Sequence, residues 1–153
     1  MTLRQINQAG RCLIGSSEGL QLTAYPDGSK VWTIGWGTTR IDGKPVTEGM
    51  TITRDQAIEY FNADMAEFER EITNYVKVPL TGNQYAALIS LCYNIGGTHF
   101  RNSTLLKKLN QRDYNGAANE FGRWIYADGK VLEGLITRRA KEKELFLTPD
   151  GVD

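Results

Sequence analysis

Only one stretch of this chain, residues 20–50, has a β pattern, and the segments around it have helical periodicity. Between Val31 and Thr39 the residues alternate, so a strand there would have one sparse face and one apolar face. The sparse face would carry Val31, Thr33, Gly35 and Gly37, and the apolar face Trp32, Ile34 and Trp36. Turn signals at Pro26-Asp27-Gly28 and Asp42-Gly43 bound this strand. The stretch predicts a small antiparallel sheet within an α+β protein.

Helical patterns lie on both sides of the β stretch. A first helix is predicted over residues 2–17, opened by a capping box of Thr2 and Gln5 and ended by Gly19. A long helix is predicted over residues 53–75, opened by a second capping box. Further helices are predicted downstream, between residues 79 and 97 and at 103–109, 114–124 and 134–147.

Composition and charge exclude several classes of function. The 153 residues are enough for one domain with its own core. Eighteen basic residues balance eighteen acidic ones, so the sequence gives no sign of nucleic-acid or stable membrane binding. With His99 as the one histidine and no ligand-spaced cluster, neither a metal nor another cofactor is expected. For His99 a surface or packing role is favoured over catalysis.

The cysteines and the N-terminus indicate the compartment. Cys12 and Cys92 are far apart and lack Cys-x-x-Cys spacing, so free thiols in a reducing compartment are favoured. Residues 1–17 contain no apolar run that is long enough for a signal peptide or an anchor. These features predict that the protein accumulates in the cytoplasm in which it is made.

Two carboxylates lie close together in sequence at the start of the β stretch. The first predicted helix has an apolar stripe that includes Ile14. Glu18 lies four residues after Ile14, at the edge of this stripe and at the C-terminal end of the helix. Burial and the negative end of the helix macrodipole would both raise the pKa of Glu18. Asp27 lies nine residues later in an exposed turn. Carboxyl groups in such unlike environments are typical of a general acid and its base, with Glu18 as the acid.

The sparse face of the predicted strand adds to this constellation. Thr33 could hold the water that Asp27 deprotonates, and Gly35 and Gly37 would let a sugar ring approach the backbone. The residues alone also fit a simpler interpretation, in which Glu18 ends a helix and Asp27 makes a structural turn.

Several motifs resemble one enzyme family. Glu18-Gly-x-x-Leu-x-Ala-Tyr25-x-Asp27, followed by Trp32-Thr33-Ile34-Gly35-Trp36-Gly37-Thr38, resembles the signature of phage-type lysozymes, glycoside hydrolase family 24. Later family blocks are matched in order by Tyr93-Asn94-Ile95-Gly96, Phe100-x-x-Ser103-Thr104-Leu105-Leu106 and Gly134-Leu135-x-x-Arg138-Arg139. The resemblance implies one lysozyme domain over residues 1–153. It would have a β lobe at about 18–52, a linking helix at 53–75, and a helical lobe at 76–148. The helix at 2–17 would pack on the helical lobe, and the active-site cleft would lie between the lobes.

The resemblance also implies roles for single residues. Glu18 would be the proton donor, and Asp27 with Thr33 would position the attacking water. Inversion is implied, which fits carboxylates roughly 6.5–9.5 Å apart. Arg139 would pair with the catalytic glutamate and oppose a rise in its pKa. Tyr93 and Ser103 would contact sugar, with packing and capping as the alternative roles.

Two features depart from the family or lie outside its motifs. Many relatives continue Gly-x-Gly with His-Thr, whereas this chain has Thr38-Thr39. The change removes one possible ion pair outside the catalytic trio. The basic residues between Arg138 and Lys143 alternate with acidic ones, which favours a solvated helix face.

The function implied is that of an endolysin, which hydrolyses the bond between N-acetylmuramic acid and N-acetylglucosamine in peptidoglycan. The protein would act as a monomer, released to the wall through a holin lesion during host cell lysis. Two alternatives stay open. A lytic transglycosylase would cut the same bond but leave Asp27 and Thr33 unexplained, and a non-catalytic peptidoglycan-binding module would not need the three side chains.

Overall fold

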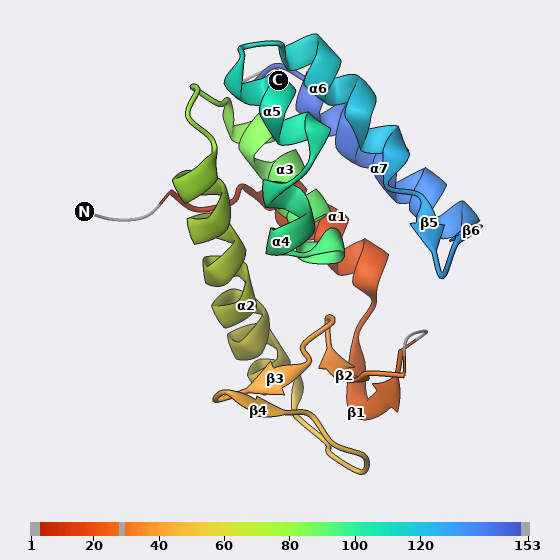
Figure 1. Cartoon of the computed structure of the whole chain (residues 1–153). Coiled ribbons are helices and arrows are strands. Elements are labelled where there is room, and N and C mark those ends of the chain that lie inside the picture. The colour runs from red at the N-terminus through yellow and green to blue at the C-terminus, as the bar shows by residue number, and fades with distance from the viewer. Residues whose placement is uncertain (1–3, 28–29, 151–153) are drawn as a thin grey trace. The chain divides into compact units, whose positions relative to one another are not determined.

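A computed structural model of the chain describes residues 4–27 and 30–150, whose helices and short antiparallel strand pairs confirm the predicted α+β class (Figure 1). The chain forms two compact units. One runs from residue 15 to residue 67, and the other joins the N-terminal residues up to Ile14 to the chain from Phe68 onward. The division into lobes at 18–52 and 76–148 with a linking helix stays a prediction.

The first helix begins later than its sequence predicts. Helix α1 spans Gln8–Glu18, and the Oδ1 atom of Asn7 accepts a hydrogen bond of 3.0 Å from a backbone amide in its first turn. Asn7 is therefore the cap of this helix, and Thr2 of the expected capping box lies outside the described residues. Just before the cap, the backbone amide of Ile6 donates to the carboxylate of Glu69 at 2.7 Å. This bond joins the segment to another part of the chain instead of to a helix.

The β stretch forms two strand pairs instead of one sheet. Strands β1 (Gln21–Pro26) and β2 (Trp32–Gly35) pair antiparallel. Strands β3 (Arg40–Ile41) and β4 (Lys44–Pro45) form a separate hairpin. Its turn is the predicted Asp42-Gly43, with φ values of 51° and 78° that suit a tight hairpin.

The predicted strand from Val31 to Thr39 ends early because of its glycines. Gly35 and Gly37 have φ values of 67° and 94°, which residues with side chains rarely adopt. They turn the chain so that Ile34 and Thr38 exchange two backbone hydrogen bonds of 2.8 and 2.9 Å. Gly35 is also buried. The expectation that Gly35 opens a surface for a sugar ring is therefore wrong, since this glycine serves the turn.

Thr38, the residue that departs from the family pattern, is 1% exposed and bonded to a carboxylate. Its hydroxyl donates to Oδ2 of Asp64 at 2.7 Å. Asp64 belongs to helix α2 (Arg54–Tyr75), which begins at the predicted capping box of Thr53 and Gln56. Burial raises the pKa of Asp64, the Thr38 hydroxyl lowers it, and the charge of Glu67 adds to the rise. A neutral hydroxyl is thus the donor to Asp64 at this position.

Replacing Thr38 by Val is expected to lower the free energy of unfolding at pH 7 by about 1–2 kcal/mol, because it leaves a partly buried carboxylate without its donor. The raised pKa of Asp64 means that the folded state holds this proton more tightly than the unfolded chain. Stability therefore falls as the pH rises from the ordinary value of 3.8 to the folded value. Urea denaturation should show a smaller cost of Thr38→Val at about pH 3 than at about pH 7. An equal cost at both would contradict this interpretation.

The helical unit is built around α3 (Gly82–Ile95), against which α7 (Glu133–Leu147) packs (Figure 1). Every residue of α3 from Tyr85 to Cys92 is buried. The helix has a complete capping box at its start and ends at Gly96, whose φ is 88°. The helices between α3 and α7 are shorter, and they are α4 (Gly97–Arg101), α5 (Thr104–Asn110), α6 (Tyr114–Glu120) and the 3₁₀ turn η1 (Phe121–Arg123).

One hairpin was not predicted. Strands β5 (Tyr126–Ala127) and β6 (Lys130–Val131) pair antiparallel around Asp128 and Gly129, whose φ values are 51° and 76°. The sequence signal, Asp-Gly between short strands, is the same one that located the turn at Asp42-Gly43.

The basic run on α7 is only in part the solvated face that its alternating charges suggested, since Lys141 and Glu144 are exposed but three other side chains are not. Arg138, Arg139 and Glu142 are 6%, 2% and 0% exposed. The carboxylate of Glu142 lies 2.6 Å from Nε of Arg139 and accepts hydrogen bonds from Nη2 of Arg139 and from Ser90. Nε of Arg138 is 3.3 Å from the same carboxylate. For these three residues the prediction was wrong because α7 packs against α3 on this side, which removes these charges from water.

Candidate functional site

Glu18 is the last residue of α1 and is half-buried. The helix ends as predicted, because Gly19 has a φ of 71° and its amide donates to the carbonyl of Gly15 at 3.0 Å. The chain then turns into β1, so that one carboxylate lies where the first helix passes into the first strand.

Asp27 directly follows β1, and its carboxylate is oriented by the backbone of the turn. Oδ1 of Asp27 accepts a hydrogen bond of 2.9 Å from the amide of Val31. The backbones of the same two residues also pair, since the amide of Asp27 donates to the carbonyl of Val31 at 2.9 Å. Gly28 of the predicted turn lies outside the described residues. These bonds fix the direction of the carboxylate.

Thr33 lies on β2 directly opposite Tyr25 of β1. Residues opposite each other in an antiparallel pair project to the same face, with their Cβ atoms about 4.5–5.5 Å apart. The hydroxyl of Thr33 donates to the carbonyl of Val31 at 2.9 Å, and its side chain is 4% exposed. Because its proton is used in this bond, the oxygen of Thr33 is available to other groups as an acceptor.

Tyr25 connects these groups electrostatically. The pKa of its phenol is raised, first by burial and then by the negative charges of Glu18 and Asp27. Charges act appreciably over a Debye length of about 8–10 Å, so both carboxylates lie within electrostatic reach of one phenol. The unit formed by residues 15–67 thus brings together Glu18, Asp27 and Thr33 around Tyr25. Sequence reasoning gave Tyr25 no role, although its place two residues before Asp27 puts both on one face of a strand.

Arg139, Tyr93 and Ser103 belong to the other unit. Besides Glu142, the Nη1 atom of Arg139 donates to Oδ1 of Asn94 at 2.8 Å and to the carbonyl of Trp124 at 3.2 Å. The guanidinium is thus held by its own helix, by α3 and by the residue that follows η1. Its pairing with Glu18 stays a prediction.

Tyr93 and Ser103 both have structural contacts. The ring of Tyr93 lies 5.1 Å from that of Phe68, centroid to centroid. Ser103 caps α5, since its hydroxyl accepts from the amide of Leu106 at 3.1 Å and donates to the carbonyl of Phe100 at 2.7 Å. Tyr93 therefore has a packing contact and Ser103 has a capping role, and these are the alternatives to sugar contact.

Ser103 also lines a depression of about 350 Å³ on the helical unit. His99 and Trp124 line it too, with their rings in an edge-to-face arrangement 5.8 Å apart. Glu120 and Arg123 complete its polar lining and are joined by a bond of 2.9 Å. The depression thus combines aromatic faces with planar polar groups, which are the groups that bind sugar rings and their acetamido substituents.

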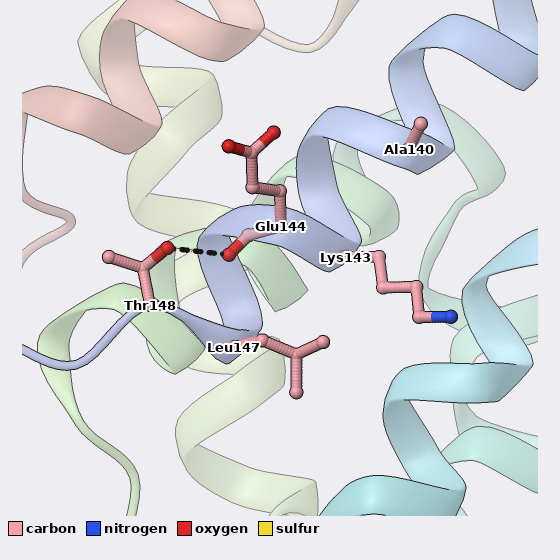
Figure 2. A pocket seen from close by; sticks show the side chains of 5 residues that line it. All are labelled: Ala140, Lys143, Glu144, Leu147 and Thr148. Atoms are coloured by element: carbon pink, nitrogen blue, oxygen red, sulfur yellow. Dashed lines mark hydrogen bonds between the residues drawn. The ribbon is translucent and has the colours of Figure 1, made fainter.

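A second depression, of about 450 Å³, involves one helix alone (Figure 2). Its lining consists of Ala140, Lys143, Glu144 and Leu147 of α7 and of Thr148, which follows that helix. The hydroxyl of Thr148 donates to the carbonyl of Glu144, which closes the helix end. None of the predicted site residues lines this depression.

Nothing in the described part of the chain resembles a metal site. Across residues 4–27 and 30–150, no three His, Cys, Asp or Glu side chains are grouped as metal ligands would be. Both cysteines are free thiols, as predicted, with Cys12 exposed and Cys92 buried.

Comparison with known proteins gives one consistent family. The family model for phage lysozyme matches residues 15–142. An endolysin of Acyrthosiphon pisum secondary endosymbiont phage 1 is 46% identical over 145 residues, covering 92% of this chain and 97% of the relative. A SAR-endolysin of Enterobacteria phage P21 is 42% identical over 130 residues, covering 85% and 77%. The solved endolysin from Escherichia coli O157:H7 phage FAHEc1 has a TM-score of 0.87 at 40% identity, covering 99% and 97%.

Proposed function

The chain belongs to the phage lysozyme family, and we propose that it hydrolyses the β-1,4 bond between N-acetylmuramic acid and N-acetylglucosamine in peptidoglycan. It is a glycoside hydrolase with a lysozyme-type fold, as its motifs predicted. The observation that supports the proposed chemistry is the electrostatic reach of both Glu18 and Asp27 to one phenol, Tyr25, opposite Thr33. In an inverting enzyme the two carboxyl groups that act on one bond lie roughly 6.5–9.5 Å apart, and two groups within reach of one phenol are compatible with that separation.

In the proposed mechanism Glu18 is the general acid. Its proton passes to the glycosidic oxygen as the bond from that oxygen to the anomeric carbon breaks. Asp27 takes a proton from a water molecule whose oxygen bonds to the same carbon from the opposite side. The oxygen of Thr33 accepts the second hydrogen of this water. Because water attacks opposite the leaving group, the product has inverted configuration at the anomeric carbon.

The environment of Asp27 suits the role of a base. One carboxylate oxygen is bonded to the amide of Val31, and the turn sets the direction of the whole group. A base that is already oriented loses less entropy in the transition state than one on a mobile side chain. We place the reacting proton on the carboxylate of Asp27 for this reason.

Substrate contacts are proposed on the helical unit. Ser103 lines a depression with aromatic and planar polar groups, which suits an N-acetylated sugar. Tyr93 would contribute a partly exposed aromatic ring. Arg139 would pair with Glu18 and stabilise its ionised form after proton transfer. The protein would act as a monomer without cofactor.

The wall is the proposed place of action, and a holin lesion is the proposed route. No helix within the described residues has both the length and the apolar character of a membrane span. Lysis of cells that express the chain is expected only when a holin is co-expressed. Lysis without a holin would contradict this route and favour export by another one.

Clearing of cell suspensions tests the activity itself. The wild-type protein is expected to clear outer-membrane-permeabilised cells, whereas Glu18→Gln, which keeps the shape but lacks the acidic proton, is not. A wild-type protein that binds isolated walls without clearing cells would identify a non-catalytic binding module instead.

A further inference from the structure

Tyr25 occupies a central position among the proposed catalytic side chains. It lies opposite Thr33 across the β1–β2 pair. It also lies two residues before Asp27, which directly follows β1. Both relations place side chains on one face of a strand pair. Glu18 reaches the same phenol electrostatically from the end of α1. A half-buried tyrosine thus lies opposite Thr33 and within electrostatic reach of the two carboxyl groups to which the proposed mechanism assigns proton transfers.

The phenol keeps its proton under all conditions in which the enzyme would work. Burial is the main cause of its raised pKa, and the charges of Glu18 and Asp27 add to it. A tyrosine whose pKa lies above the ordinary value of 10.0 is neutral at physiological pH. The hydroxyl is therefore a permanent hydrogen-bond donor that adds no charge to the site.

Such a donor has a specific use in this reaction. Before the reaction the negative charge is on Asp27, and after proton transfer it is on Glu18. A neutral donor within reach of both carboxylates can stabilise whichever one is ionised. It does so without rearrangement of the backbone, because Tyr25 is fixed in a strand.

We propose that Tyr25 is a positioning residue of this site, whose hydroxyl donates to the ionised carboxylate of the Glu18–Asp27 pair, directly or through the attacking water. The inference rests on the proposed function, since it gives Glu18 and Asp27 the roles described above. It predicts that removal of one oxygen atom slows the reaction without loss of the fold.

The kinetic test is Tyr25→Phe, which keeps the ring and removes the hydroxyl. We expect kcat to fall about 10- to 100-fold with little change in KM and in Tm. Loss of a donor raises the pKa of an ionised carboxyl group, so both limbs of the pH–rate profile should move to higher pH. Tyr126→Phe is the control, since Tyr126 is 60% exposed on β5 and has no assigned role. A wild-type kcat and an unmoved profile in Tyr25→Phe would overturn the inference.

The placement of Tyr25 is tested independently by its own titration. In protein with ¹³C-labelled tyrosine rings, the resonance of Tyr25 is the one missing from Tyr25→Phe. Its midpoint should fall in Glu18→Gln and also in Asp27→Asn, because each change removes one negative charge near the phenol. A midpoint that is unchanged in either variant would show that the phenol does not reach both carboxylates.

A wild-type protein that does not cut peptidoglycan would contradict the proposed function, and with it the role of Tyr25. If Glu18→Gln retains wild-type activity, the proposed acid role of Glu18 is wrong and the role of Tyr25 falls with it. If Glu18→Gln is inactive while Tyr25→Phe is fully active, the proposed function stands and this inference alone is wrong.

Discussion

Glu18→Gln is expected to lower kcat on purified peptidoglycan by about 100- to 10,000-fold, the range that a general acid contributes. Glutamine keeps the size of the side chain but has no proton to give to the glycosidic oxygen. Glu18 is half-buried at the end of α1, so the replacement should leave Tm close to that of the wild type. Release of soluble muropeptides per unit time measures kcat, and thermal denaturation provides the control for folding.

Asp27→Asn should lower kcat over the same range, because an amide cannot accept the proton of the attacking water. Asparagine retains an oxygen that can accept the hydrogen bond from the amide of Val31, so the turn should persist. Since acid and base act in one step, a variant with both Glu18→Gln and Asp27→Asn should have a kcat only slightly lower than that of the less active single variant. Multiplicative losses would contradict a concerted role, and full activity of Asp27→Asn would favour a mechanism without a base.

Glu142→Gln is expected to destabilise the fold by about 3–5 kcal/mol, which is the usual cost of breaking a buried ion pair from one side. The change leaves the guanidinium groups of Arg138 and Arg139 in the interior without their carboxylate. For a chain of this size such a loss lowers Tm by roughly 6–20 °C. Urea or thermal denaturation measures it.

Glu144→Gln is the matched control on the same helix. Glu144 is exposed and lies two residues from Glu142 in sequence, so the same change of charge should alter stability by no more than about 0.5 kcal/mol. Similar losses in both variants would show that net charge, and not the buried pair, determines the effect.

The sequence predicted the parts of this fold that local chemistry specifies. The capping box at Thr53 and the glycine at position 19 lie at real helix ends, because caps and positive φ values act within a few residues. The Asp42-Gly43 hairpin was found for the same reason. The hairpin at Asp128-Gly129 was missed, although it has the same signal and strands of the same length as β3 and β4.

The errors came from contacts between segments far apart in sequence. Thr2 and Gln5 have the pattern of a capping box, but α1 starts at Gln8, after a segment bonded to Glu69. The charges on α7 alternate as on a solvated face, and only packing against α3 shows that Glu142 is buried. No local pattern carries this information.

The residues of the proposed site were likewise predicted only where a local motif marks them. Glu18, Asp27 and Thr33 were found from their motif, and the unit that contains them brings them near Tyr25. Tyr25 itself was overlooked because tyrosine in a strand is usually a packing residue. Its relation to the two carboxylates is visible only from the register of β1 and β2 and from the charges that act on the phenol.

The most direct test of the central claim is the chemistry of the glycan ends produced from purified peptidoglycan. Mass spectrometry of the products, with NMR of the fresh anomers, should show muramic acid with a reducing end that first appears as the α-anomer. This result is expected if Glu18 protonates the leaving oxygen while Asp27 activates water on the opposite face. Products that end in 1,6-anhydromuramic acid, or fresh β-anomers, would contradict the account.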